Sequence, residues 1–468
     1  MKAVLVTIGA AAVAVAGFAT ALVLWLGSAS ALHITPRVPG TDRPPGTAVA
    51  ADSGSFLTRH LLTKGEGKPA DLLSAWPRFR GGNFDGVSTD QTALARTWPA
   101  GGPKVLWSVE LGEGHAGAAI WNGRAFVLDY DRQKKTDVLK CLSLTDGKEI
   151  WRHSYPVDVK RNHGMSRTIP AVTDKVVVAL GPKCHVTCFD PKTGELKWGI
   201  DLVKEYGAKV PPWYAGQCPL VDNDRVILAP GGPDTLLLAV EAETGKPVWK
   251  TPNANDWAMT HASIVPMDFK DKRMYVYCAS GGVVGVNAED GRILWETDAW
   301  KISIATVPSP VIIGDGRIFL AGGYNAGAML LTLKEDGGTF TAEPGLRLLP
   351  KVFGAAQQTP VFYNGCLYGV RPDGELVCLD LEGKTVWSSG PEHRFGLGPY
   401  LVAGGLLYVL SDTGLLALVE ATPEGYKPLA RAQVLEGPDA WAPMAIASGR
   451  LIARDLTHMV CLDVAAKQ

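Results

Sequence analysis

The chain has 468 residues, enough for two or three ordinary domains or one large repetitive domain, and apolar residues make up 46% of it. Lys plus Arg number 46 against 47 for Asp plus Glu, so the net charge is -1 and gives no electrostatic reason to expect a nucleic-acid partner. The 53 Gly, 32 Pro and 14 Trp favour a turn-rich β protein.

The N-terminal segment is apolar. Residues 3–26 carry no charge and follow a single Lys. As a helix they would extend about 36 Å, more than the roughly 30 Å of a bilayer core. Two interpretations are open for residues 1–31: a signal peptide cleaved after the "ASA" of Ala29–Ala31, or an uncleaved single-pass anchor, which the length favours because signal-peptide cores usually have about 7–15 residues. Both place the rest of the chain on the extracytoplasmic, periplasmic side, attached to the cell membrane or secreted.

Residues 32–68 are predicted to be a flexible linker. Their first part is rich in Pro, Gly and Ala and has no hydrophobic periodicity.

A repeat follows. Five segments share a Gly four residues before a Trp: Gly147/Trp151, Gly194/Trp198, Gly245/Trp249, Gly291/Trp295 and Gly383/Trp387. The Trp spacings are 47, 51, 46 and 92 residues, so degenerate copies are expected near 341 and 431, and Trp107 stands 44 residues before Trp151. A fixed period near 46 residues indicates a repeat architecture.

Each repeat predicts four short strands. In one copy, the apolar runs 168–172, 175–181, 185–190 and 195–200 are separated by turn residues. Four antiparallel strands per unit are typical of a propeller blade. The Gly of each repeat supplies the positive φ of the last turn, and the Trp is expected to pack between neighbouring blades.

The two ends of the repeat region complement each other. The last unit reaches Cys461 and ends before its Trp, whereas the strand around Trp107 has no inner strands before it. Together they make one blade, so residues 104–468 are predicted to form an all-β, eight-bladed propeller closed by the N-terminal strand. Seven blades remain the alternative if one degenerate copy is misassigned.

The cysteines are predicted to be small buried hydrophobic residues rather than disulfide partners. Cys141, Cys188, Cys378 and Cys461 share one position of the repeat, and equivalent positions of different blades lie far apart. His185, between two Cys, lacks the further neighbours that a metal site requires, so no metal site is predicted.

The D-x-x-T-G-x-x-x-W element resembles the repeat of pyrroloquinoline-quinone (PQQ) type propellers, over roughly residues 104–465. The resemblance implies one of two branches: eight-bladed quinoprotein alcohol dehydrogenases, which hold PQQ and Ca²⁺ on the propeller axis, or BamB-like outer-membrane assembly factors, which are scaffolds without a cofactor. The chain departs from the first because it has no Cys-Cys pair and no alignable Ca²⁺ ligand set. It departs from the second because no Cys precedes Cys141 to carry a lipid.

Residues 69–103 are predicted to be a capping segment. The stretch "WPRFRGGNFDGVSTD", from Trp76, looks like the segment that precedes the propeller in quinoproteins. Trp76, Phe79 and Phe84 are expected to form a lid over one end of the propeller. The alternative is that Arg78 or Arg80 contacts a ligand.

The loops that lead into the innermost strands should gather at one mouth of the propeller. They are residues 161–168, 211–218, 256–261, 353–359, 393–400 and 439–444. They carry the candidate ligand-binding residues His163, Arg167, Trp213, Tyr214, Gln217, Trp257, His261, Gln357, Gln358, Arg394 and Trp441. Such a set suits a ring-shaped polar ligand or a peptide. The alternative is that these side chains only satisfy one another.

We therefore predict an extracytoplasmic, non-catalytic binding or scaffold protein with no cofactor, a membrane contact through its N-terminal segment, and a protein or small polar ligand at the propeller mouth. The alternative is a PQQ-dependent oxidoreductase acting on an alcohol or sugar, with His163, Arg167 and the mouth tryptophans around PQQ and Ca²⁺.

Overall fold

The computed structural model describes residues 15–24, 56–73 and 75–466. The chain divides into two units, residues 1–53 and 54–468. In the first, residues 15–24 are helical. Within the described ranges no helix has the length and apolar character needed to cross a bilayer, and most of the predicted anchor lies outside those ranges.

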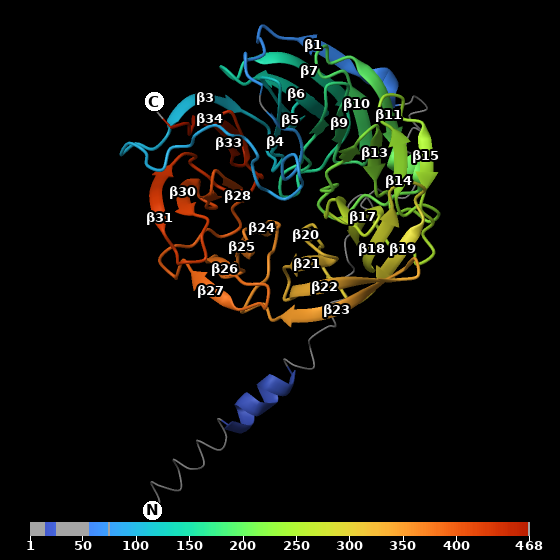
Figure 1. The fold of residues 1–468 in the computed structure, drawn as a ribbon, viewed down its shortest axis with the longest axis vertical. Helices are drawn as coiled ribbons and strands as arrows, with labels where there is room; N and C mark the ends of the chain where they lie inside the picture. The colour runs from blue at the N-terminus through green and yellow to red at the C-terminus, as the bar shows by residue number, and fades with distance from the viewer. Residues whose placement is uncertain (1–14, 25–55, 74, 467–468) are drawn as a thin grey trace, which may run out of the picture. The chain divides into compact units, whose positions relative to one another are not determined.

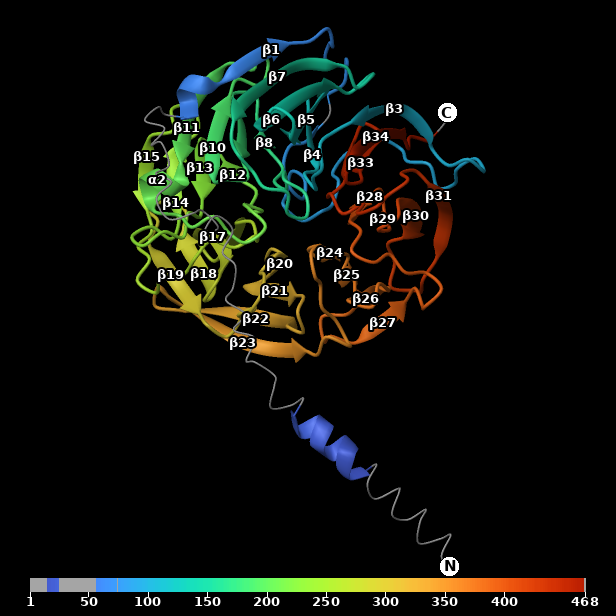
Figure 2. The same cartoon turned by 180° about the vertical axis from the view of Figure 1, so that it is seen from behind.

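The second unit is an eight-bladed β-propeller, as the repeat predicted. Eight antiparallel sheets stand around a central axis, with the first strand of each sheet toward the axis and the fourth at the rim (Figure 1). The same ring is seen from behind in Figure 2. Propeller closure leaves only short edge strands, which limits edge-to-edge aggregation.

Each blade contributes one strand to each of four concentric layers. The innermost strands, in blade order, are β4 (Ala118–Trp121), β8 (Ala171–Val172), β12 (Leu220–Asp222), β16 (Val265–Phe269), β20 (Val311–Gly314), β24 (Val361–Tyr363), β28 (Tyr400–Ala403) and β32 (Ala445–Ala447). The second strands are β5 (Arg124–Asp131), β9 (Val177–Leu180), β13 (Arg225–Leu228), β17 (Lys272–Ala279), β21 (Arg317–Gly322), β25 (Cys366–Val370), β29 (Leu406–Leu410) and β33 (Arg450–Arg454). The third strands are β6 (Thr136–Ser143), β10 (His185–Phe189), β14 (Leu238–Glu241), β18 (Gly282–Asn287), β22 (Gly327–Asp336), β26 (Leu376–Leu379), β30 (Leu415–Glu420) and β34 (His458–Asp463). The outer strands are β7 (Glu149–Pro156), β11 (Leu196–Asp201), β15 (Pro247–Lys250), β19 (Ile293–Thr297), β23 (Thr339–Leu348), β27 (Thr385–Ser388), β31 (Pro428–Gln433) and β3 (Lys104–Glu110).

The repeated Trp and Gly join neighbouring blades. Gly194 has φ +73°, and a Cβ there would lie 2.6 Å from the ring of Trp151 in the preceding blade. Trp198 in turn packs on Gly245, and its Nε1 donates a hydrogen bond to the Ala242 carbonyl at 2.9 Å. Each of these large rings is therefore buried against backbone that only glycine leaves open.

Trp249 repeats this contact between the third and fourth blades. A Cβ on Gly291 would lie 2.5 Å from its ring, and its Nε1 donates to the Ala288 carbonyl at 3.2 Å. Trp107, on the outer strand of the last blade, packs in the same way on Gly147 of the first.

Trp295 and Trp387 are also buried between blades, as predicted, but each meets a partner other than the glycine of the following blade. The Trp295 ring covers Gly285 of its own blade, and its Nε1 lies 3.3 Å from the sulfur of Met274. Trp387 Nε1 donates to the Thr422 carbonyl at 2.8 Å, and its ring lies 5.8 Å from that of Tyr426. The blade that follows each of them is a degenerate copy, whose turn presents no glycine to the indole.

Substituting the repeat glycine should loosen the blade interface. We expect Gly194→Ala to cost about 1–2 kcal/mol for the positive φ and about 1–3 kcal/mol more for overpacking against Trp151. Gly365→Ala is the matched control, because Gly365 has φ +79° but a Cβ there would meet nothing within 4 Å. Urea denaturation of both variants measures the difference, and equal losses would contradict the packing role.

The degenerate copies occupy the expected outer strands. Phe340 is buried on β23, in the slot predicted near 341. The slot near 431 lies on β31, which carries no aromatic residue. Because β23 has no Trp, Gly383 of the next blade faces Leu346 and Leu348 instead of an indole.

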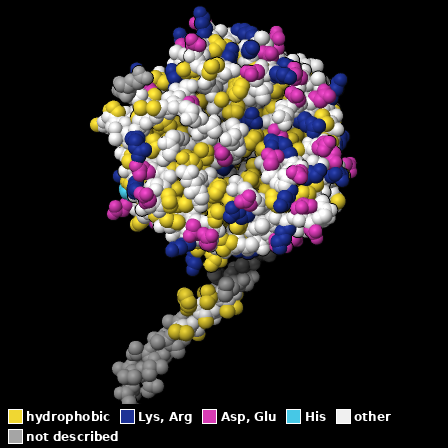
Figure 3. Space-filling model, in the orientation of Figure 1, with side chains coloured by type: hydrophobic (Ala, Val, Ile, Leu, Met, Phe, Trp, Pro, Cys, Tyr) yellow, Lys and Arg dark blue, Asp and Glu magenta, His cyan; other side chains and the backbone are white. Residues whose placement is uncertain are grey.

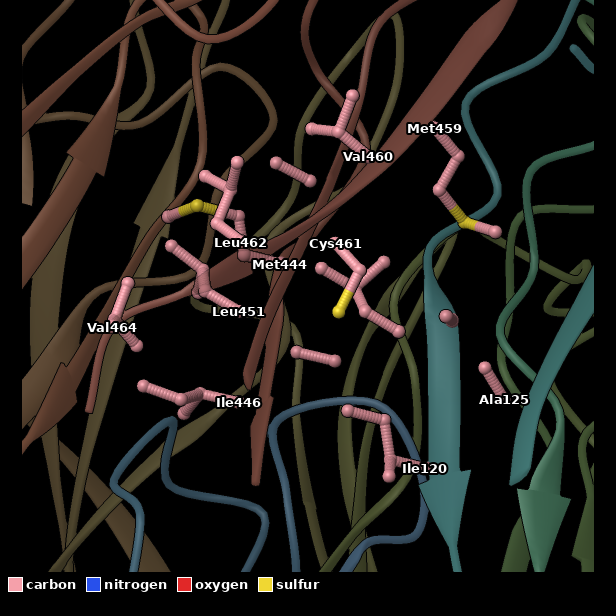
Figure 4. Close-up of a cluster of buried hydrophobic side chains, with 14 of the residues drawn as sticks. Ile120, Ala125, Met444, Ile446, Leu451, Met459, Val460, Cys461, Leu462 and Val464 are labelled. Atoms are coloured by element: carbon pink, nitrogen blue, oxygen red, sulfur yellow. The ribbon is translucent and has the colours of Figure 1, made fainter. Parts of the chain in front are cut away.

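The last blade takes its outer strand from the start of the propeller. β3 pairs antiparallel with β34, with Trp107 opposite Cys461. Figure 4 shows Ile120 and Ala125 of the first blade beside Ile446 and Cys461 of the last, in one continuous hydrophobic cluster.

The linker prediction is wrong for residues 56–64. They form η1 (Phe56–Arg59) and β1 (Leu61–Lys64), and β1 pairs with β7 at the rim of the first sheet. Phe56 is buried and stacks on His185 at a ring distance of 4.4 Å. A four-residue strand carries too few residues to show periodicity, and its stability comes from this tertiary contact. We call residues 56–64 the strap.

The capping segment crosses the inner ends of several blades. β2 (Ala75–Trp76) pairs with β4 of the first blade. Arg78 donates to the Val221 carbonyl of the third blade, and Arg80 donates to the Thr359 and Pro360 carbonyls before the sixth. Both guanidinium groups thus bind backbone carbonyls of the propeller.

Two further features complete the fold. All eight cysteines are buried and free, as predicted. One short helix, α2 (Leu202–Tyr206), follows β11 and was not predicted; Asp201 caps it by accepting from the Val203 and Lys204 amides.

Candidate ligand-binding site

A cavity of about 320 Å³ lies where the loops before the innermost strands converge. Its lining comes from the loops entering every blade except the seventh, from one turn between the second and third strands of the fifth blade, and from the capping segment. The lining residues are Phe79, His115, His163, Arg167, Ile169, Trp213, Gly216, Cys218, His261, Ser263, Ala305, Val307, Tyr324, Gln357, Gln358, Trp441 and Pro443. Phe79 belongs to the capping segment, so the lid closes one side of the cavity.

Most of the predicted mouth residues are brought together here. The cavity is lined by His163, Arg167, Trp213, His261, Gln357, Gln358 and Trp441. Repeat phase was sufficient to find them because equivalent loops of a propeller project at the same end of the axis.

Four predicted residues do not line the cavity. Tyr214 is buried and donates its hydroxyl to the Lys160 carbonyl at 2.7 Å. Gln217 is buried, and its Oε1 accepts from the Ala229 amide at 2.9 Å. The Gln217 side chain turns into its own blade, and the Tyr214 side chain packs on Val159 and Met165 of the preceding mouth loop.

Trp257 and Arg394 lie elsewhere. The Trp257 indole covers Gly281, where a Cβ would lie 2.1 Å from its Nε1. Arg394 is exposed and forms an isolated bridge with Glu375. Loop phase alone cannot show how far a loop reaches inward, and the loop that carries Arg394 does not reach the cavity.

Among the lining residues with a ring side chain, sequence reasoning missed three. His115 precedes β4 at the same repeat phase as the other mouth loops, so a signal for it existed. Tyr324 comes from the turn between β21 and β22, which carries no such signal. Phe79 was assigned to the lid but also faces the cavity.

Arg167 is held by backbone carbonyls. Its Nε donates to the Trp213 carbonyl at 2.5 Å, and its Nη2 donates to the carbonyls of Asn162 at 3.0 Å and His163 at 2.6 Å. Burial lowers the pKa of Arg167 to about 10, which leaves the group charged at neutral pH. The loops of the second and third blades are thereby locked together around one cation.

His115, which is buried, and His261, which is half-buried, are neutral. Burial, followed by the positive charge of Arg167, lowers the pKa of His115 to about 3 and that of His261 to about 4. His115 Nε2 lies 3.0 Å from the His163 carbonyl, and His261 Nε2 lies 3.0 Å from the Pro212 carbonyl. Since a carbonyl can only accept, each Nε2 carries the proton and each Nδ1 is an acceptor.

Hydrogen bonds also hold the part of the cavity that Trp441 lines. Trp441 Nε1 donates to Asp412 Oδ1 at 2.8 Å, and the Trp441 ring lies 5.1 Å from that of His115. Gln358 Nε2 donates to the Trp441 carbonyl at 2.9 Å. Neighbouring mouth loops therefore satisfy many of one another's polar groups, which makes the cavity preformed.

The lining has few groups for chemistry. No Asp or Glu is among the cavity residues that the structure describes. Burial raises the pKa of Cys218 to about 11, so this lining thiol is not a thiolate nucleophile. The arrangement suits recognition better than proton abstraction, for which a base near neutral pKa is needed.

Comparisons with known proteins agree with the repeat. The family model described as outer membrane protein assembly factor BamB matches residues 134–388. The BamB of Moranella endobia is 21% identical over 340 residues, covering 68% of this chain and 70% of that protein. The BamB of Yersinia pestis is 23% identical over 325 residues, covering 66% and 72%. The quinoprotein alcohol dehydrogenase PedH of Pseudomonas putida is 24% identical over 175 residues, covering 35% of this chain and 28% of its own length.

Solved structures share the fold. BamB from Moraxella catarrhalis superposes with a TM-score of 0.52 at 13% identity, covering 77% of this chain and 99% of that chain. A europium-containing methanol dehydrogenase superposes with a TM-score of 0.57 at 13% identity, covering 84% and 90%. The fold is therefore shared with BamB and with quinoprotein dehydrogenases alike. The family model that matches more than half of the sequence is that of BamB, so the chain belongs to the family of the outer membrane protein assembly factor BamB.

Proposed function

We propose that this chain is a non-catalytic binding or scaffold protein that holds a small polar ligand, or a segment of a partner protein, in its axial cavity. The observation that carries the proposal is the preformed cavity, in which Arg167, His261 and Gln358 are fixed by carbonyls of neighbouring loops. The names of the BamB relatives, as assembly factors, support a scaffold role.

The proposed setting is extracytoplasmic, at or near a membrane. The uncharged stretch of residues 3–26 supports it. The propeller surface supports a partner other than nucleic acid, because Lys, Arg, Asp and Glu are interspersed over the face shown in Figure 3.

A PQQ-dependent oxidoreductase is the second candidate, favoured by the charged Arg167 beside Trp213 and by the likeness to PedH. A Ca²⁺-bound quinone needs hard oxygen ligands, and carboxylates above all. The described lining offers only amide, hydroxyl and carbonyl oxygens, and no carboxylate base. These residues do not fit the Ca²⁺–PQQ pair, and we derive no oxidation step from them.

One experiment separates the two functions. The purified full chain is heated with and without PQQ plus Ca²⁺ while its tryptophan fluorescence is followed, and dye-linked alcohol oxidation is then assayed. We expect no turnover. A rise in melting temperature together with turnover would overturn the binding role in favour of the enzyme.

A partner experiment tests the scaffold itself. The tagged chain is recovered from membranes and its reproducible partners are identified. We expect Trp213→Ala, in the cavity, to lose the partner and Trp257→Ala, which removes an indole outside the cavity, to keep it. Equal recovery by both variants, or the absence of a reproducible partner, would contradict the proposed function if the probes described below also fail to bind.

A further inference from the structure

Arg167 is the one permanently charged side chain among the cavity residues that the structure describes, and it has no acidic partner there. Its hydrogen bonds all go to carbonyl oxygens, and no carboxylate of the described residues lies within salt-bridge distance of it. Its Nη1 donates to no group in the described part of the protein. Arg167 is half-buried, and cations that are largely removed from water are normally paired with an anion, so the positive charge in this cavity is uncompensated.

His115 supports one of the carbonyls that Arg167 binds. His115 is 7% exposed, and its Nδ1 is closed off from solvent and has no hydrogen-bond partner among the described residues. Its Nε2 and the Nη2 of Arg167 both reach the His163 carbonyl, at 3.0 and 2.6 Å. One carbonyl is therefore shared by an imidazole and the cation, which holds Arg167 in place at the cavity wall.

The backbone at this point is strained. His163 has φ +49° and Trp213 has φ +63°, a region in which non-glycine residues are uncommon. These two residues supply carbonyls to Arg167, and their side chains line the cavity. Strained φ values that the surroundings hold in place are found preferentially at ligand clamps.

We propose that the cavity binds an organic anion with a flat, apolar body. Its negative group pairs with Arg167. Trp213 and Trp441 supply aromatic surfaces for the body of the ligand. Asp439 interacts electrostatically with His163 but does not line the cavity, so it leaves the charge of Arg167 unpaired. This inference rests on the proposed binding function and names the chemical class of the ligand.

Two matched probes test the contact by calorimetry on the full chain. 3-Hydroxybenzoate carries the charge, and 3-hydroxybenzamide has the same ring and hydroxyl group but no charge. We expect 3-hydroxybenzoate to bind more tightly by roughly 10- to 100-fold, the size typical of a charged hydrogen bond.

Variants assign the contact to Arg167. Arg167→Gln should remove the preference for benzoate over benzamide, and Arg167→Lys should retain part of it. The control is Arg161→Gln, which removes the same charge from the same loop at an exposed ion pair with Glu113. If Arg167→Gln fails to fold, the probe comparison on the unsubstituted chain still decides the question. Equal affinity for the acid and the amide overturns the anion site.

The failures of the two proposals are distinguishable. If the amide or another neutral probe binds as well as the acid, the cavity is a ligand site but not one for anions, and only this inference fails. If no probe binds and Trp213→Ala leaves partner recovery unchanged, the binding function fails with it.

Discussion

Arg454→Met should destabilise the propeller by about 3–5 kcal/mol, because it removes a buried cation that ties the last blade to the first. Arg454 stands at the end of β33 and is 1% exposed. Its Nη1 donates to the Ala116 carbonyl at 2.9 Å and its Nη2 to the Gly112 carbonyl at 2.8 Å. Methionine keeps much of the side-chain volume but leaves those buried first-blade carbonyls without donors.

The measurement is the urea midpoint, followed by tryptophan fluorescence. Arg450→Met is the matched control, since it makes the same substitution on the same strand. Arg450 is half-buried, and its Nη1 reaches only the Ser448 carbonyl at 3.3 Å. We expect the control to lose less than about 1 kcal/mol. A loss of similar size in both variants would show that Arg454 does not hold the seam.

The propeller could be predicted because its signal is repeated. A Gly that needs positive φ and a Trp that needs a neighbouring blade recur at one spacing, so each copy supports the others. Even the degenerate copies could be placed from the period, as Phe340 on β23 shows. The period could not show what replaces the glycine beside Trp295 and Trp387, because those partners lie outside the repeated positions. The pairing of β3 with β34 agrees with the half-blades at the two ends of the repeat.

The candidate site could be predicted only in part, because repeat phase fixes where a loop begins but not how far it reaches. It placed His163 and Arg167 correctly at the mouth, yet it also included Arg394, whose loop stays outside the cavity. Tyr324 could not be found, since it comes from a turn between other strands. The hydrogen bonds that make Arg167 an unpaired cation depend on carbonyl positions that no local pattern encodes.

The strap shows a different limit. No local pattern in residues 56–64 predicts a strand, because their partners are side chains about 90 residues or more away in the sequence. His60 Nδ1 lies 3.0 Å from His153 Nδ1, and Phe56 stacks on His185. The strap therefore docks on the first two blades through a cluster of three imidazoles, and this cluster predicts how docking responds to pH.

Acidification should release the strap. Burial, followed by the nearby His153 and His185, lowers the pKa of His60 to about 3, and burial lowers that of His153 to about 4, below the usual 6.5. Burial lowers the pKa of His185 as well, although Asp201 opposes the effect. Each docked histidine excludes a proton that the undocked form binds, so docking is fully stable above about pH 6.5 and weakens as pH falls toward 3–4. By about pH 4.5 the loss for His60 alone amounts to about 2–3 kcal/mol.

Hydrogen exchange of the peptide that contains β1, corrected for the intrinsic exchange rate, is the appropriate measurement at about pH 7 and pH 4.5. A global unfolding midpoint would not serve, because burial raises the pKa of Asp137 to about 7 and this carboxyl stabilises the fold as pH falls. We expect β1 to lose protection at the lower pH while β31 keeps it. His60→Phe retains a ring against Tyr155, which stacks on His60 at 4.6 Å, but residue 60 can no longer be protonated, so β1 should lose less protection at the lower pH than in the unsubstituted chain. His153→Phe should have the same effect, and the double variant should lose least, because burial lowers the pKa of each of the two histidines in the docked state. Protection of β1 that is unchanged by acid in the unsubstituted chain, or lost to the same extent in the unsubstituted chain and the double variant, would mean that the histidine cluster does not control the strap.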